Sequence, residues 1–227
     1  MTGKEVYKVL MALGSDNLYH ANSVKTSLSL LKLGGLESRG AVKARRLPQT
    51  SQISDEKDQK YGIWHDSFLD THDIHRALNC RNFYGPVLFV MAAKLLLDLP
   101  VRTTVLVTRC NPTKWGGLTD DRRYFLTTHE LAAGLQAGCA DHMVTIRSPD
   151  GIIPFAGLVQ HIILDEPRLG APHVGQEYVA ARDAILAAAA QAGIQVQVQR
   201  RTCVSCNCTT QYQDATKPKR IGYFFNP

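Results

Sequence analysis

The spacing of apolar residues at the start of the chain predicts a helix, a strand and a second helix. Apolar positions three or four residues apart predict a helix over residues 4–13, and residues 17–20 are typical of a short strand. Ser23 then supplies an N-cap for a helix that extends to Leu33. The glycine pair 34–35 ends this helix, because glycine adopts the left-handed conformation that is common at helix C-termini.

The rest of the chain predicts a sheet with helices before and after it. Residues 36–60 are polar and basic without a regular period, and such a long stretch inside a compact domain is usually functional or mobile. The remaining pattern predicts strands over 87–91, 103–108, 142–147, 160–164 and 194–199, and helices over 92–97, 128–137 and 176–192. Because the strands cluster in the middle, the pattern predicts an α+β fold with a largely antiparallel or mixed sheet.

Length and composition describe a globular protein with room for one large domain. The chain has 227 residues, of which 44% are hydrophobic and 20% charged. It contains no run near the roughly 18 apolar residues that a membrane span needs, so no membrane contact is expected. The N-terminal segment lacks the pattern of a secretory signal. We expect a cytoplasmic protein.

Positive charge is concentrated in two segments. Lysine and arginine total 26 against 20 acidic residues, which gives a formal net charge of +6. One basic segment covers residues 39–50 and the other begins at residue 199. The second segment supplies the candidate nucleic-acid ligands Arg200, Arg201, Lys217, Lys219 and Arg220. A polyanionic partner such as nucleic acid fits this distribution, and so does a solvated basic face.

Three cysteines stand together near the C-terminus, at Cys203, Cys206 and Cys208. Disulfides are rare in a reducing cytosol. The cluster is therefore either a set of free thiols or a structural zinc site that takes a fourth ligand from elsewhere.

The most informative motif is LYHANSVKTSLSLLKLGGLESRG, residues 18–40. It places His20 at the end of a strand beside a helix N-terminus, where an imidazole can donate to a ribose hydroxyl. A buried histidine bonded to the backbone would have the same local sequence. The common phosphate-loop, dinucleotide, hydrolase and zinc-protease signatures are absent from the sequence.

This motif resembles the opening of the ADP-ribosyltransferase superfamily, and within it the DarT- and CmdT-like toxins that modify nucleic acid. The resemblance implies a split mixed or antiparallel sheet with flanking helices and NAD in its cleft. It assigns His20 to the ribose next to nicotinamide, with Ala21 and Asn22 near the carboxamide. It also implies a catalytic domain over residues 1–200 and a basic, cysteine-containing tail over 201–227, packed on that domain or extending from it.

Further site residues follow from the resemblance. The candidates are Arg39 and Arg46 for catalysis and Ser38, Arg45, Tyr61 and Trp64 for binding NAD. A guanidinium pairs with a diphosphate through two hydrogen bonds, and an aromatic ring can stack on nicotinamide. A solvated basic loop and ordinary core packing of the aromatic rings are the alternatives.

An acidic residue on a late strand completes the superfamily pattern. The matching segment, residues 140–146, offers Asp141 and no glutamate. Asp141 is therefore the expected carboxylate that stabilises the cationic sugar. Glu130 and an aspartate between residues 66 and 73 are the alternatives.

The stretch WHDSFLDTHDIHR supports a different class of enzyme. With helical spacing, His72 and His75 share one face, as metal ligands would. Asp66 and Asp70 share another. A metal-dependent nuclease that uses the cluster from His65 to His75 is therefore an alternative function, and a non-catalytic nucleic-acid-binding module is a third.

The resemblance as a whole implies an NAD-dependent mono-ADP-ribosyltransferase that acts on nucleic acid, with RNA favoured over DNA as the acceptor. NAD is the expected co-substrate, and zinc is the candidate structural metal. Such an enzyme is expected to be the toxin of a toxin–antitoxin or phage-defence system, with an antitoxin protein as its partner.

Overall fold

The structure is a computed structural model that describes residues 1–78, 81, 83–100, 102–136, 139–148, 152–167, 175–202, 207–212 and 220–227. Its strands are β1 (Asn17–Asn22), β2 (Gly35–Leu36), β3 (Ser67–Asp70), β4 (Val87–Ala92), β5 (Thr104–Thr108), β6 (Tyr124–Phe125), β7 (Met143–Arg147), β8 (Ile153–Pro154), β9 (Val159–Asp165) and β10 (Val198–Arg201). Its α-helices are α1 (Gly3–Ala12), α2 (Val24–Leu33), α3 (Arg39–Ala44), α4 (Asp55–Lys60), α5 (Ile74–Leu78), α6 (Asp120–Arg123), α7 (Thr128–Gly134), α8 (Gln176–Gln191), α9 (Cys208–Tyr212) and α10 (Arg220–Phe225). Two 3-10 helices, η1 (Ala93–Leu97) and η2 (Pro112–Lys114), complete it.

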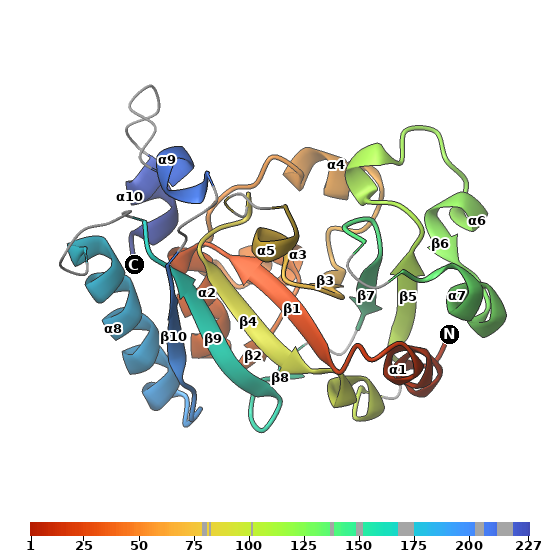
Figure 1. Ribbon diagram of the computed structural model, residues 1–227, viewed down its shortest axis with the longest axis horizontal. Helices are drawn as coiled ribbons and strands as arrows, with labels where there is room; N and C mark the ends of the chain where they lie inside the picture. The colour runs from red at the N-terminus through yellow and green to blue at the C-terminus, as the bar shows by residue number, and fades with distance from the viewer. Residues whose placement is uncertain are drawn as a thin grey trace.

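A mixed sheet forms the centre of the molecule. Within the described ranges, eight strands pair in the order β10-β9-β4-β1-β3-β7-β5-β6, and β2 pairs with β8 in a small second sheet. Neighbours in the large sheet are antiparallel, apart from the parallel pair β9 and β10. Helix α8 lies at the β10 end, and α1 and α7 lie at the β5–β6 end (Figure 1). The α+β class and the mixed sheet expected from the sequence are confirmed.

None of the helices in the described ranges has both the length and the apolar character needed to span a membrane.

Local sequence signals set the ends of α2. Ser23 is its N-cap and accepts a hydrogen bond from the backbone N–H of Thr26 at 3.3 Å, which satisfies one of the free amides of the first turn. The helix ends at Leu33, and Gly34 follows in the left-handed conformation with φ of 76°. The predicted bounds of this helix are confirmed.

Residues 36–60 include the end of β2 and the six-residue helices α3 and α4, which are too short to show an apolar period. One expectation about regular structure is wrong. The strand expected over 194–199 instead covers Val198–Arg201. Ile194 is buried, and its N–H still donates to Ala189 in α8 at 2.8 Å. The residues after Ile194 therefore carry the chain from the helix to the sheet before pairing begins.

The polar loop between α3 and α4 is hydrogen-bonded to α2. Ser23 Oγ donates to Thr50 Oγ1 at 2.6 Å, and the backbone N–H of Thr50 donates to Thr26 Oγ1 at 2.9 Å. Ser29 Oγ donates to the carbonyl of Pro48 at 2.5 Å. Because these polar groups are buried and satisfied, the loop has a defined path over the end of α2.

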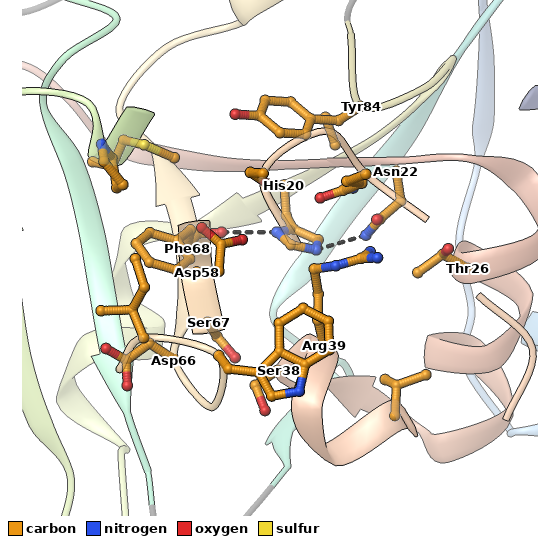
Figure 2. A pocket seen from close by; sticks show the side chains of 18 of the residues that line it. His20, Asn22, Thr26, Ser38, Arg39, Asp58, Asp66, Ser67, Phe68 and Tyr84 are labelled. Atoms are coloured by element: carbon orange, nitrogen blue, oxygen red, sulfur yellow. Dashed lines mark hydrogen bonds between the residues drawn. The ribbon is translucent and has the colours of Figure 1, made fainter. Parts of the chain in front are cut away.

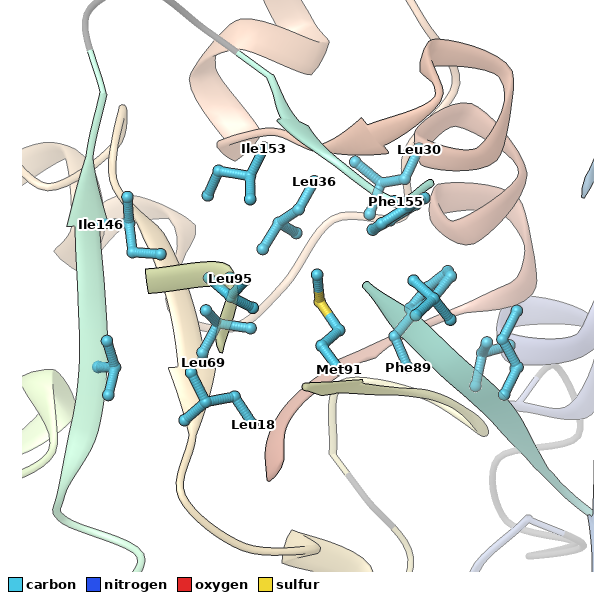
Figure 3. Close-up of a cluster of buried hydrophobic side chains, with 14 of the residues drawn as sticks. Leu18, Leu30, Leu36, Leu69, Phe89, Met91, Leu95, Ile146, Ile153 and Phe155 are labelled. Carbon is cyan, nitrogen blue, oxygen red and sulfur yellow. The ribbon is translucent and has the colours of Figure 1, made fainter. Parts of the chain in front are cut away.

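The main apolar core lies between the large sheet and the layer formed by α2, β2 and β8. Figure 3 shows Leu18, Leu69 and Met91 from the strands near Leu36 and Ile153 from the small sheet. Burying a side chain of this size stabilises a fold by roughly 1.5–3 kcal/mol. The core therefore fixes β1 and β3, on which the candidate site is built.

The sheet divides between β1 and β3. β1 pairs with β4 at six positions, from Asn17 to Asn22. Its pairing with β3 is confined to Tyr19 and Asp70. Beyond that pair the two strands separate, and the side chain of His20 lies at the fork between them. The split that the resemblance implied is present at this point.

Candidate active site

A cavity of about 830 Å³, counted to its open mouth, lies beside the fork between β1 and β3. Its wall comes from β1, α2, α3, α4, β3 and the start of η2, with Tyr84 and Met143. Figure 2 shows side chains of both charges, among them Arg39 and Asp58, around the imidazole of His20.

His20 links the two strands of the fork. Its Nδ1 donates to the carbonyl of Phe68 at 2.8 Å, and its Nε2 accepts from Nδ2 of Asn22 at 2.7 Å (Figure 2). Since a carbonyl only accepts and an amide nitrogen only donates, the ring is neutral with its proton on Nδ1. Burial, with a smaller contribution from the nearby Arg39, lowers the pKa of His20 to about 4. The imidazole is therefore a neutral, fixed group at physiological pH.

Arg39, the first residue of α3, places its guanidinium in the cavity wall. Its Nε and Nη2 donate to the carboxylate of Asp55 at 2.6 and 2.9 Å, and Nη2 also donates to the carbonyl of Thr50 at 3.0 Å. The remaining nitrogen, Nη1, is buried and has no hydrogen-bond partner in the part of the chain that the structure describes. An unsatisfied guanidinium nitrogen beside a cavity is a ready donor for an anionic ligand.

Trp64 supports the guanidinium of Arg39 from the cavity wall. Arg39 Cζ lies 5.6 Å from the centroid of the indole ring, a cation–π contact. Gly40 allows α3 to approach this closely, because a Cβ there would lie 2.6 Å from the ring of His65 and 2.7 Å from that of Trp64. The backbone N–H of Gly40 also donates to the carbonyl of Trp64 at 2.9 Å.

Two of the acidic residues that line the cavity are neutralised by arginine. Glu37 accepts from Nε and Nη2 of Arg45 at 3.0 and 2.9 Å. Asp66 accepts from the same two atoms of Arg147 at 2.9 and 2.8 Å. Both carboxylates are almost fully buried, and each lies in a two-bond ion pair. Their charge is therefore already matched within the protein.

The other two acidic residues of the wall, Asp58 and Asp70, are buried and form no ion pair with any described residue. Burial raises the pKa of Asp58 to about 6, and the neighbouring Asp55 adds to the rise. Burial raises the pKa of Asp70 well above its usual range, with a smaller contribution from Asp73. Unmatched buried carboxyl groups are costly to fold and are typical of functional sites.

Tyr84 completes the wall next to these two acids. Burial raises the pKa of its phenol, and the nearby Asp70 and Asp58 raise it further. The next residue, Gly85, has φ of 144°, and a Cβ there would lie 2.3 Å from the carbonyl oxygen of Asn22. Glycine is therefore required at this position, and it lets Tyr84 sit close to β1.

The cavity brings together six of the residues nominated from the sequence. They are His20, Ala21, Asn22, Ser38, Arg39 and Trp64. Ser38 is also the N-cap of α3, where its Oγ accepts from the backbone N–H of Ala41 at 3.2 Å. The roles assigned to these residues in binding and catalysis stay predictions.

Three other nominated residues, Arg45, Arg46 and Tyr61, do not line the cavity in the described structure. The side chain of Arg45 is 50% exposed. Arg46 is exposed and has the left-handed backbone conformation, with φ of 58°. The ring of Tyr61 packs 5.7 Å from that of Trp115 in a second apolar cluster. Their roles at an NAD site stay predictions.

Asp141 lies just behind the wall. Its carboxylate accepts from Lys114 Nζ at 2.8 Å and from the backbone N–H of Asn111 at 3.0 Å. Asn111 itself lines the cavity, whereas Asp141 is not among the described residues that do. The catalytic role of Asp141 stays a prediction.

Sequence reasoning missed Asp58, Tyr84 and Asn111 as site residues, and it treated Asp70 as one of several possible acids. No local pattern marks the first three, because each reaches the cavity from a different loop or short helix. The signal for Asp70 was the short apolar segment SFLD, which forms β3.

The histidine- and aspartate-rich stretch does not gather at one site. Asp66 bonds to Arg147, Asp70 lines the cavity, and Nδ1 of His75 bonds to Asp165 at 2.8 Å. Ser67–Asp70 form the strand β3 and α5 begins only at Ile74, so the helical spacing assumed between Asp66 and Asp70 for the metal-dependent nuclease is wrong. Among the residues that the structure describes, no three His, Cys, Asp or Glu side chains form a group that could hold a metal ion.

The two nominated arginines of β10 face carboxylates. Arg200 Nη2 lies 3.0 Å from Glu166 Oε2. Arg201 Nε lies 2.6 Å from Asp165 Oδ1, and its Nη1 lies 2.5 Å from Asp73 Oδ2. Their positive charge is balanced locally, and nucleic-acid binding by them stays a prediction.

The described parts of the C-terminal tail pack on the main fold. Cys208, Tyr212, Phe224 and Phe225 are buried in the main core, and α10 contacts α2 and α8. Cys203, Cys206, Lys217 and Lys219 lie outside the described residues, and of Arg220 only the backbone is described. The zinc site therefore stays a prediction.

Comparison with solved structures identifies the fold. The chain is similar to "Thermus sp. 2.9 DarT in complex with ADP-ribosylated ssDNA", with a TM-score of 0.52 and 13% sequence identity. The match covers 83% of this chain and 95% of that chain. No protein-family model matches the sequence, and no curated protein is a significant match. The expected ADP-ribosyltransferase-like fold is thus confirmed as the fold of DarT.

Proposed function

We propose that this protein is an NAD-dependent mono-ADP-ribosyltransferase that acts on nucleic acid. The observation that carries the proposal is the cavity at the fork of a DarT-like sheet, where a neutral His20 and the unsatisfied Nη1 of Arg39 lie in one wall. The motif of residues 18–40 supports the same conclusion from the sequence.

The residues of the cavity fit NAD. The buried, unpartnered Nη1 of Arg39 is a donor for the diphosphate. His20 and Asn22 present fixed polar groups for the ribose and carboxamide next to nicotinamide, and Trp64 offers an aromatic face. The wall combines apolar side chains with charged and polar groups, as a site for a polar cofactor does.

The reaction depends on placement and electrostatics. Cleavage of the bond between ribose C1′ and nicotinamide sends its electron pair to nicotinamide, and an acceptor atom then donates a pair to C1′ and releases a proton. Arg39 holds the diphosphate of the ADP-ribose part that is transferred, and His20 orients the ribose without changing its protonation. A cavity carboxylate stabilises the electron-deficient ribose carbon.

We infer that the acceptor is a single-stranded nucleic acid. The DarT structure of similar fold contains ADP-ribosylated ssDNA, whereas the resemblance read from the sequence favours RNA. The net charge of +6 favours a polyanionic acceptor of either kind. The resemblance carried by residues 18–40 supports a toxin that is controlled by an antitoxin protein.

Adenylate-labelled NAD tests this function. The protein is incubated with separate pools of RNA, single-stranded DNA and cell protein, and each pool is digested to locate the label. We expect label in one nucleic-acid pool, and we expect His20→Ala and Arg39→Gln to lower nicotinamide release at least about 100-fold, the loss typical of a transition-state donor. Asp98→Asn, on an exposed loop, is the matched control.

Two outcomes contradict the proposal. Label confined to protein would exclude a nucleic-acid acceptor, and no NAD cleavage by the folded wild-type protein would exclude the transferase. Expression without antitoxin tests the toxin: growth should stop with the wild type and continue with Arg39→Gln.

A further inference from the structure

We propose that Asp70 is the catalytic carboxylate, which faces the reacting ribose and stabilises the positive charge that develops at C1′. This inference rests on the proposed transferase function and names a residue of the same site. It differs from the expectation drawn from the sequence, which assigned this role to Asp141.

The charges of the cavity wall narrow the choice of carboxylate. Glu37 and Asp66 are held in two-bond pairs with arginine, so a further cation gains little from them. Asp141 is bonded to a lysine behind the wall. Asp58 and Asp70 are the cavity acids without an ion pair among the described residues.

Electrostatic surroundings separate Asp58 from Asp70. Arg39 acts on Asp58 and lowers the cost of its charge, so Asp58 lies toward the part of the wall assigned to the diphosphate. No cation among the described residues acts on Asp70 in this way, and Asp73, the charged residue that does act on it, is also acidic. A buried carboxylate with no cation of its own gains most when positive charge develops beside it.

Asp70 and His20 line the same cavity. His20 Nδ1 donates to the carbonyl of Phe68, two residues before Asp70 on β3. Residues two apart on a strand are about 6.6 Å apart, so the carbonyl that holds the imidazole is close to Asp70 along β3. Asp70 and the imidazole therefore lie within the dimensions of one bound ribose-nicotinamide unit.

The position of Asp70 is also rigid. It pairs with Tyr19 on β1 and with Met143 on β7, so a strand holds it on each side. Met143 lines the cavity with it. Electrostatic stabilisation of a transition state requires such preorganisation, because a mobile charge would first have to be moved into place. Asp58, by comparison, belongs to the short helix α4.

The role of Asp70 in this reaction is electrostatic. The bond from C1′ to nicotinamide breaks, its electron pair leaves with nicotinamide, and the acceptor or water supplies the new pair. The proton of the acceptor goes to solvent. Asp70 acts in its ionised form, which the positively charged nicotinamide-ribose unit of bound NAD favours, and it forms no covalent bond.

The test compares Asp70→Asn, Asp58→Asn and Asp141→Asn in the full-length protein. The readouts are NAD affinity by calorimetric titration, the rate of nicotinamide release at saturating NAD, and thermal unfolding. We expect Asp70→Asn to lower the saturated rate about 100- to 1,000-fold while NAD affinity changes less than about tenfold. We expect Asp58→Asn and Asp141→Asn to lower that rate less than Asp70→Asn does.

Folding is controlled separately. Asparagine has nearly the same shape as aspartate and removes a buried charge, so Asp70→Asn should unfold at the wild-type temperature or above it at pH 8. If it does not fold, Asp70→Glu replaces it; that variant keeps the charge but moves it by one methylene, and we expect an intermediate rate. Asp98→Asn remains the surface control.

Each result decides between the two proposals. A folded Asp70→Asn variant with the wild-type rate, or a larger loss in Asp58→Asn or Asp141→Asn, would overturn the assignment of Asp70 and leave the transferase intact. A wild-type protein that neither binds nor cleaves NAD would overturn both.

Discussion

Two clusters of Asp, His and Arg side chains differ in how completely their charges are matched. In the first, which we call the Asp165 cluster, Asp165 accepts hydrogen bonds from Tyr212 at 2.9 Å and Arg201 at 2.6 Å and bonds to Nδ1 of His75 at 2.8 Å. Arg201 also pairs with Asp73. In the second cluster, the wall of the cavity, one guanidinium nitrogen has no hydrogen-bond partner and two carboxyl groups form no ion pair with any described residue.

This difference separates structural from functional use of the same residue types. Burying a charge costs free energy unless a partner and hydrogen bonds offset that cost. In the Asp165 cluster, partners within the protein offset the cost of burying the charges. The cluster connects α5, β9, β10 and α9. In the cavity the offset is incomplete, as expected where a ligand supplies the missing charge. Counting charged residues along the sequence does not distinguish these two cases.

The largest loss of stability is expected when the Asp165 cluster loses its central carboxylate. Asp165→Ala leaves Tyr212, Arg201 and His75 without their shared carboxylate, and we expect it to lower the free energy of unfolding by about 3–5 kcal/mol. Urea denaturation at pH 7 measures the change. The control is Asp183→Ala, which removes an exposed ion pair with Arg182 on α8 and should cost under about 1 kcal/mol. A loss for Asp165→Ala no larger than that of the control would contradict the comparison.

An intermediate loss of stability is expected when the pH is lowered, because His20 in the cavity is buried in its neutral form. The pKa of His20 is about 4 in the folded protein and ordinarily 6.5, so between these values the unfolded chain binds a proton that the folded protein does not. Stability from neutral His20 is therefore lost as pH falls from 6.5 to 4, by about 2 kcal/mol between pH 7 and pH 5.

The variant His20→Asn isolates this effect. The raised pKa of Asp58, about 6, acts in the opposite direction, because its folded form keeps a proton that the unfolded chain releases. The stability difference between wild type and His20→Asn should shrink as pH falls from 7 to 5, measured by urea denaturation at each pH. A difference that stays constant with pH would show that His20 titrates normally.

The smallest effect is expected where the tail meets the cavity loop. Tyr223 of α10 donates from its hydroxyl to the carbonyl of Ser51, and the next residue, Gln52, lines the cavity. Tyr223→Phe removes one hydrogen bond worth about 0.5–1.5 kcal/mol. We expect NAD affinity to fall about threefold to tenfold. Unaltered affinity in this variant would show that the loop does not need the tail.

Tyr7→Phe, on α1 at the other end of the molecule, is the matched control for Tyr223→Phe. NAD titration should give the wild-type affinity for this control, and thermal unfolding of both variants should remain close to that of the wild type.

Local sequence signals were sufficient to predict the first strand, the helix α2 and the residues that these elements bring to the cavity. The Ser23 cap, the apolar period of α2 and Gly34 fix that helix within a few residues of chain, and the strand before it ends near His20. The same short segment delivers Ser38 and Arg39. These residues reach the cavity because a strand, a helix and a tight turn determine their geometry locally.

Strand pairing across the sheet determined the positions of the other charged residues. Asp70 and Asp66 were placed on a helical face, but hydrogen bonds with β1 and β7 make that stretch a strand. The sequence predicts that Arg201 is a solvent-exposed cation that could bind nucleic acid. In the structure, the pairing of β10 with β9 brings it into ion pairs with Asp165 and Asp73. Whether a charge is matched depends on its spatial neighbours.

The sequence by itself determined an α+β fold, the helix that carries the cavity and the positions of His20 and Arg39, because these depend on local propensity and apolar period. Only the tertiary structure decided which charges are matched and which remain for a ligand. Those decisions depend on strand register and burial, which join residues far apart in the chain and have no local signature in the sequence.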